Sequence, residues 1–101
     1  MGTVIAEISV VPIGTGETGV GDYIHDVIEK LKGETSVRFE VNPMGTVLEG
    51  ELEDVLNVIR HLHEVPFKDG AKRVLTDIKI DDRRDKTESM HRKVARATGT
   101  V

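Results

Sequence analysis

The sequence predicts one α+β domain spanning residues 1–101, in which two helices cover one face of a four-stranded antiparallel sheet. Three observations lead to this fold class. Apolar residues alternate with polar ones in four segments, as in half-buried strands. They recur with helical spacing in two segments that separate these strands, and glycine or proline stands at most of the boundaries. With 38% hydrophobic and 32% charged residues, the chain has the balance of one globular domain with a single core.

The first half of the chain predicts a strand, a helix and a second strand. Residues 3–13 alternate with the period of two of a strand, and a glycine-rich stretch follows them. Residues 22–32 have the i, i+3, i+4, i+7 spacing of an amphipathic helix, with Asp22 as the expected N-cap and Gly33 as the expected end. Residues 36–44 alternate again and lead into a proline-containing turn.

The second half predicts a hairpin strand, a long helix, a last strand and a short terminal helix. The segment 46–49 is short and β-branched at its start, so we expect it to return antiparallel to the second strand. The next helix has apolar residues at helical spacing over 52–62, and Pro66 together with residues 68–70 is expected to stop it and form a loop. A strand over 73–80 and a short basic helix over 87–97 complete the chain.

This order of elements is βαββαβ with an added C-terminal helix, which is typical of a ferredoxin-like sandwich. Both main helices cover the same sheet face, so the other face is bare. The pattern leaves the register of the third strand open, because either Val47 with Glu49 or Thr46 with Leu48 would lie on the bare face. A mixture of aliphatic and charged side chains there favours self-association. The residues that the other three strands are expected to place on the bare face are Ile5, Glu7, Ser9, Val11, Arg38, Glu40, Asn42, Leu75, Asp77 and Lys79.

Composition excludes several classes of function. The formal net charge is −4, and the chain has two Phe, one Tyr and no Trp, so it lacks both the positive charge and the stacking surface of a nucleic-acid binder. Without cysteine it has no disulfide, thiolate nucleophile or cysteine-bound zinc. No apolar run approaches the roughly 20 residues of a membrane span, and no secretory leader is evident. We therefore expect a cytoplasmic protein with no membrane or nucleic-acid partner.

Two motifs suggest chemistry at first sight. Residues 14–19 read G-x-G-x-x-G between a strand and a helix, but a dinucleotide-binding fold needs a parallel βαβ crossover, whereas a hairpin follows here. A flexible glycine loop is the simpler interpretation. His61 and His63 point roughly 200° apart on a helix, which argues against a shared metal and favours an interaction with the C-terminal helix dipole. No nucleophile with its base is recognisable, so we expect no catalysis, metal or cofactor.

Three segments carry a resemblance to a known family. They run from Glu7 to Gly14, from Asn42 to Glu51 and from Lys72 to Arg83. They resemble the thiamine-binding protein family, long catalogued as uncharacterised, and the resemblance covers nearly the whole chain. Its most specific part is the strand-turn-strand segment from Pro43 to Gly50, together with the first segment. Ile13 stands where the family usually has leucine, which is a swap of similar volume.

The resemblance implies a ferredoxin-like fold, homo-oligomers built by association of sheets, commonly dimers paired into tetramers, and non-enzymatic binding of thiamine or its hydroxymethylpyrimidine moiety. An aminopyrimidine needs a hydrogen-bond acceptor, a hydroxyl or amide donor and apolar walls. An acidic net charge suits the positive thiazolium ring. The expected polar contacts are Ser9, Asn42, Thr46 and Glu49, and the expected walls are Ile13 and Met44.

Two other functions are compatible with the sequence. The chain could be an oligomeric regulatory or scaffold protein that uses the bare sheet face only for assembly. It could also be a dimeric ferredoxin-like isomerase or monooxygenase, although no internal acid–base pair stands at matched positions. A ligand that raises the unfolding midpoint would favour the binding protein over the scaffold, and turnover abolished by Glu49→Ala would favour the enzyme.

Overall fold

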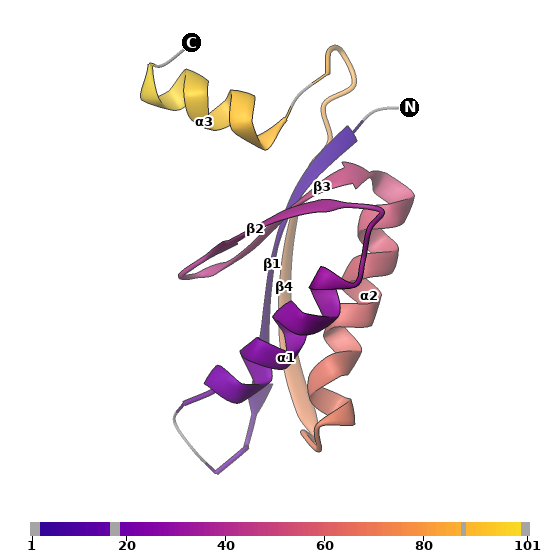
Figure 1. Cartoon of the computed structure of the whole chain (residues 1–101), viewed down its shortest axis with the longest axis vertical. Helices are drawn as coiled ribbons and strands as arrows, with labels where there is room; N and C mark the ends of the chain where they lie inside the picture. The colour runs from indigo at the N-terminus through magenta and orange to yellow at the C-terminus, as the bar shows by residue number, and fades with distance from the viewer. Residues whose placement is uncertain (1–2, 17–18, 88, 100–101) are drawn as a thin grey trace.

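The computed structural model describes residues 3–16, 19–87 and 89–99, and it confirms the predicted fold class (Figure 1). The elements are β1 (Thr3–Ile13), α1 (Gly21–Lys32), β2 (Arg38–Asn42), β3 (Gly45–Glu51), α2 (Leu52–Lys68), β4 (Arg73–Asp81) and α3 (Met90–Thr98). The four strands form one antiparallel sheet in the order β2-β3-β1-β4. The first and third strands therefore occupy the centre of the sheet, and β2 and β4 form its edges.

The core lies between the sheet and helices α1 and α2, which pack against each other (Figure 1). Every second residue of β1 from Val4 to Pro12 is buried, because the strand period turns these side chains toward the helices. Leu31 of α1, Leu48 of β3 and Leu62 of α2 are fully buried in the same cluster. One apolar layer therefore holds the sheet and both helices together.

The register between β1 and β3 resolves the alternative left open for the third strand. Ala6 pairs with Leu48, so Leu48 and Thr46 turn toward the helices and are buried there. Val47 and Glu49 consequently lie on the sheet face that α1 and α2 leave uncovered. We call this second surface the open face.

Two local predictions are wrong. Asp22 does not cap α1, because the N-cap position is Val20, which offers no side-chain hydrogen bond. Pro66 lies inside α2, which continues to Lys68, so the helix ends in the expected segment 68–70 but not at the proline. Proline removes one backbone donor from a helix, but here it lies in the last turn and is buried together with Val65. Apolar packing of that turn outweighs the missing hydrogen bond.

The C-terminal helix α3 stands apart from α1 and α2 (Figure 1). Ser89 caps its start by accepting a hydrogen bond from the N–H of Arg92, and Gly99 ends it with a φ of 74°. Within Met90–Thr98 only Met90 is buried, and Val94 is 59% exposed. Polar contacts with the sheet, rather than a large apolar interface, therefore position α3.

Candidate functional site

The open face carries more acidic than basic side chains. Paired residues in a sheet share a face and successive residues alternate, so the register assigns every position. The face therefore suits a cation or a neutral polar ligand better than an anion. Its acidic residues are Glu7, Glu40, Glu49, Glu51, Asp77 and Asp81, and its basic residues are Arg38, Arg73 and Lys79.

Two shallow depressions adjoin each other at this face. The larger has a volume of about 510 Å³ and the smaller about 320 Å³. Glu7 and Lys79 line both, so together they form one trough over β1 and β4. Ile5 and Val47 contribute apolar surface to the larger depression, and Ser9 contributes a hydroxyl to the smaller. Apolar surface with a few polar groups is the usual lining of a small-molecule site.

Two carboxylates flank Val47 on the open face. Glu7 of β1 and Glu40 of β2 both pair with Val47 in the sheet register. Glu7 Oε1 lies 3.5 Å from Lys79 Nζ, and Glu40 Oε1 lies 3.1 Å from His91 Nε2. All four side chains reach solvent, so these contacts are weak and a cationic ligand can take their place.

Glu49 is a buried carboxylate on this otherwise accessible face, with only 4% of its surface exposed. Its Oε1 accepts a 2.9 Å hydrogen bond from the backbone N–H of Met90, and its Oε2 lies 3.5 Å from Arg38 Nε. A carboxylate at the first turn of a helix is stabilised by the positive end of the helix dipole. Glu49 therefore anchors the start of α3.

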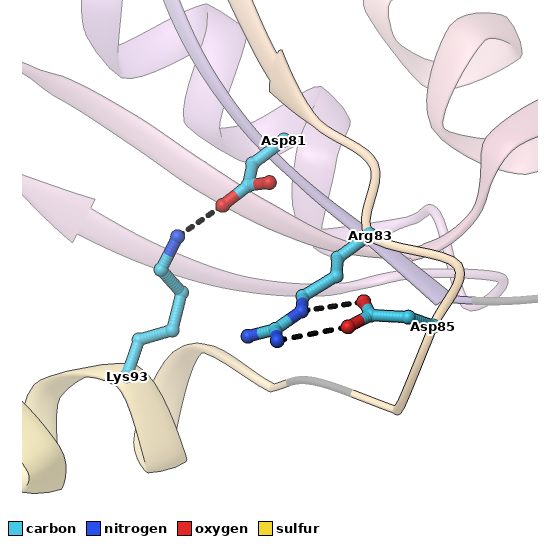
Figure 2. Close-up of polar contacts among 4 residues, drawn as sticks. All are labelled: Asp81, Arg83, Asp85 and Lys93. Atoms are coloured by element: carbon cyan, nitrogen blue, oxygen red, sulfur yellow. Dashed lines mark hydrogen bonds and ion pairs between the residues drawn. The ribbon is translucent and has the colours of Figure 1, made fainter.

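Two further contacts hold α3 over the same end of the open face. Lys93 pairs with Asp81, the last residue of β4 (Figure 2). His91 pairs with Glu40 of β2. Together with Glu49 of β3, these partners come from three strands and share one face, so the N-terminal half of α3 covers part of the open face.

The connector between β4 and α3 is organised by its own charges. Arg83 donates hydrogen bonds of 2.6 Å and 3.0 Å to the two carboxylate oxygens of Asp85 (Figure 2). Arg84 makes the same kind of pair with Asp82, at 2.7 Å for the shortest bond. These arginine hydrogen bonds hold the pKa values of both carboxyl groups below their usual range. The connector therefore remains internally ion-paired at neutral pH.

The structure brings two of the predicted contact residues close together. Gly45 pairs with Asn42 in β2, and continuing the β1–β3 register by one residue places Ser9 on its other side. A Cβ at Gly45 would lie 3.0 Å from the carbonyl oxygen of Ile8, so glycine permits close approach of the strands. Ser9 and Asn42 consequently flank a position without a side chain on the open face.

The other predicted contact residues lie elsewhere. Glu49 is four residues from Gly45 along β3, or about 13 Å at the usual rise of a strand. Thr46 is on the helix-covered face and is buried. Ile13 ends β1, and Met44 lies at the exposed β2–β3 turn. The six residues therefore do not form one compact pocket in a single chain.

Sequence reasoning did not select Glu7, Val47, Lys79 and Asp81 as contact residues, although they line the trough. The alternation in β1 already placed Glu7 on the same face as Ser9. What was missing was the register between strands, which decides the neighbours of each residue across the sheet.

The two histidines of α2 have specific partners. His61 Nδ1 lies 2.9 Å from Glu34 Oε1, and His63 Nδ1 lies 2.7 Å from Thr76 Oγ1. Because α2 extends to Lys68, both lie within the helix, and the expected interaction with its C-terminal dipole gives way to these side-chain contacts. Among residues 3–16, 19–87 and 89–99, no three His, Asp or Glu side chains gather to hold a metal ion.

No helix in the described part of the chain is long and apolar enough to cross a membrane. The fold and this surface together define a small ferredoxin-like α+β protein with an acidic sheet face that α3 partly covers. The sequence model of the thiamine-binding protein family matches residues 6–98, and the chain belongs to this family. The resemblance seen in the sequence is thereby confirmed.

Relatives from bacteria and archaea share nearly the full length of the chain. The UPF0045 protein YqgV of Bacillus subtilis is 43% identical over 93 residues, covering 89% of each chain. A UPF0045 protein of Methanothermobacter thermautotrophicus is 39% identical over 92 residues, covering 90% of this chain and 92% of its own. These relatives carry no activity in their names, so they support the family and its fold.

Solved structures agree with the fold. The hypothetical protein MJ1052 of Methanocaldococcus jannaschii superposes with a TM-score of 0.85 at 36% identity and covers 100% of both chains. A Thermotoga maritima protein, TM0486, superposes with a TM-score of 0.76 at 27% identity, covering 94% of this chain and 98% of its own. The name of that protein proposes a role in thiamine biosynthesis or salvage.

Proposed function

We propose that this chain is a non-enzymatic binding protein for thiamine or its hydroxymethylpyrimidine moiety, and that the ligand lies on the open face. The observation that carries this proposal is the acidic trough beside Glu7, in a member of a family described as thiamine-binding. The name of the Thermotoga maritima relative points to the same vitamin.

The thiazolium ring of thiamine carries a fixed positive charge and a flat apolar surface. Val47 offers apolar contact between the carboxylates of Glu7 and Glu40. A thiazolium ring over Val47 would replace the Lys79 and His91 side chains that now contact these carboxylates. Because both of these pairs are exposed, little stabilisation is lost in the exchange.

The aminopyrimidine ring presents an amine donor beside ring-nitrogen acceptors. Ser9 and Asn42 flank Gly45, two residues before Val47 on β3, or about 7 Å along the strand. A single methylene group joins the two rings of thiamine, so the ligand spans this interval. The hydroxyl of Ser9 and the amide of Asn42 supply both donors and acceptors to the pyrimidine. Ile13, Met44 and Glu49 would then contribute only through a second subunit or through α3, and Thr46, buried on the helix-covered face, would not touch the ligand.

The binding unit in this proposal is a homo-oligomer, a dimer of dimers. This part of the proposal is supported by apolar surface on β4 that stays exposed in the single chain. Leu75, Ile78 and Ile80 are 55%, 45% and 41% exposed there. Exposed aliphatic residues in one strand are typical of an interface.

Calorimetric titration with thiamine and with hydroxymethylpyrimidine tests the proposal. Glu7→Gln should weaken thiamine binding about tenfold and leave the pyrimidine, which has no fixed charge, nearly unaffected. Ser9→Ala should weaken both ligands. Glu64→Gln, an exposed acidic position on α2, is the matched control. Absence of binding heat for both ligands at millimolar concentration would contradict the proposal.

A further inference from the structure

Weak packing distinguishes α3 from the other two helices. α1 and α2 share one apolar cluster with the sheet, whereas α3 packs only loosely on the rest of the described chain. Within Met90–Thr98 only Met90 is buried. Segments that bury little apolar surface open locally at a small cost in free energy. α3 can therefore leave the sheet while the core stays folded.

Three groups that hold α3 on the sheet contact acidic side chains of the open face. One is a backbone N–H at the start of the helix, and the other two are basic side chains. Their partners belong to three different strands, so α3 presents positive and hydrogen-donating groups to a face that suits cations. The contacts are Met90 N–H with Glu49 of β3, His91 with Glu40 of β2, and Lys93 with Asp81 of β4 (Figure 2).

Two of these contacts reach opposite edges of the sheet. Side chains two residues apart on a helix point roughly 200° from each other, so His91 and Lys93 extend to opposite sides of α3. Their partners lie in β2 and β4, the two edge strands. α3 therefore spans one end of the open face, and loss of either contact frees one side of the helix.

The same carboxylates border the proposed position of the thiazolium ring. Glu40 flanks Val47, and Asp81 lines the larger depression together with Val47. A ligand cation over Val47 and the basic side chains of α3 therefore compete for shared acidic partners. While α3 is seated, it neutralises part of the charge that attracts a cationic ligand.

We infer that α3 is an autoinhibitory lid of the proposed binding site. In the closed form its first turn takes the place of a cationic ligand at Glu40 and Asp81, and tight binding requires that α3 open. When only a fraction of the protein is competent to bind, the apparent affinity falls by that fraction. This inference rests on the proposed function and adds a regulation of the same site, because any condition that releases α3 raises the affinity for a cationic ligand.

Two matched variants of α3 test the lid by calorimetry with thiamine. Lys93→Met keeps the length of the side chain but removes its contact with Asp81. Because that pair is exposed, we expect binding about three- to fivefold tighter than in the wild type. Arg92→Met removes the same charge from an exposed side chain that pairs with no carboxylate among the described residues, so it should change the affinity much less. Equal affinities in the two variants, or weaker binding by Lys93→Met, would overturn the inference.

Amide hydrogen exchange shows directly whether the ligand and α3 exclude each other. Without ligand, exchange over residues 90–98 should be faster in Lys93→Met than in Arg92→Met. Saturating thiamine should speed exchange over the same residues in the wild type, while exchange in α2 does not increase. Circular dichroism checks that each variant is folded. Slower exchange in α3 on binding would mean that the helix closes over the ligand, and this result would also overturn the inference.

The calorimetric outcomes separate the lid from the proposed ligand. Thiamine binding of equal strength in the wild type and both variants overturns the lid and leaves the proposed function standing. No binding heat in any of the three proteins at millimolar thiamine contradicts the proposed ligand, and the lid with it. Tighter binding in Lys93→Met alone supports both.

Discussion

The two faces of the sheet use the same alternating strands in different ways. On the helix-covered face, Leu48 and its neighbours are buried in one apolar cluster with α1 and α2. On the open face, Val47 lies between two exposed carboxylates, and α3 is held mainly by polar contacts. The first face determines stability, and the second leaves its side chains available for a ligand or a partner. Consecutive residues of one strand can therefore have separate roles.

The largest expected effect on the free energy of unfolding comes from truncating a buried side chain on the helix-covered face. Leu48→Ala removes a fully buried side chain and should lower the free energy of unfolding by about 2–5 kcal/mol. Val47→Ala, on the opposite face of the same strand, should lower it much less and should instead weaken thiamine binding. Denaturant unfolding and calorimetry of both variants measure this difference. Equal destabilisation would show that the open face is part of the core.

The next effect concerns the anchor of α3. Glu49→Ala removes the acceptor of the Met90 N–H and should destabilise α3 by about 1–2 kcal/mol. Glu49→Gln keeps an acceptor oxygen and should have a smaller effect. Amide hydrogen exchange over residues 90–98 should accelerate in the alanine variant, while exchange in α2 stays unchanged. Unaltered exchange in α3 would mean that its other ion pairs suffice to hold it.

A third pair of variants compares two predicted contact residues on opposite faces. Asn42→Ala should weaken hydroxymethylpyrimidine binding several-fold with a stability change within about 0.5 kcal/mol, because the side chain is exposed on the open face. Thr46→Val, on the covered face, should leave binding unchanged. The comparison is made by calorimetry at matched concentrations. A larger loss of binding in the threonine variant would place the ligand between sheet and helices.

The smallest effect lies in the helix layer and depends on pH. A hydrogen bond with the Asp26 side chain raises the pKa of Asp69 above its usual 3.8. A raised pKa in the folded state means that the wild-type chain loses stability as the pH rises through that value. Asp69→Asn should therefore melt slightly higher than the wild type at pH 7, with the difference shrinking below pH 3.8. A constant difference at all pH values would exclude a titrating pair.

The sequence was sufficient for the covered face, because periodicity alone places Val4, Ala6 and Ile8 together. It was not sufficient for the open face. Thr46 and Glu49 were candidates together, but alternation along β3 places them on opposite faces, and only the register shows that Glu49 is the one on the open face. A one-residue choice of register exchanges the faces, and no local pattern in the short third strand decides it.

Contacts between distant residues were also beyond local reasoning. Glu49 and Met90 are 41 residues apart, and their hydrogen bond depends on the path of the charged connector. Pro66 looked like the end of a helix, but burial of the last turn of α2 overrides its local effect. In both cases tertiary packing decides the outcome. The family resemblance, in contrast, depends on whole segments and was recognisable directly.

The most direct test of the central claim is the thermal unfolding midpoint of the wild-type protein with thiamine, its phosphates and hydroxymethylpyrimidine. A ligand that binds only the folded state stabilises it by about 2.7 kcal/mol at a hundred times its dissociation constant. We expect a concentration-dependent rise with thiamine and with hydroxymethylpyrimidine, and a smaller rise with the anionic phosphates, because the open face is acidic. No rise with any of them at millimolar concentration would contradict the account.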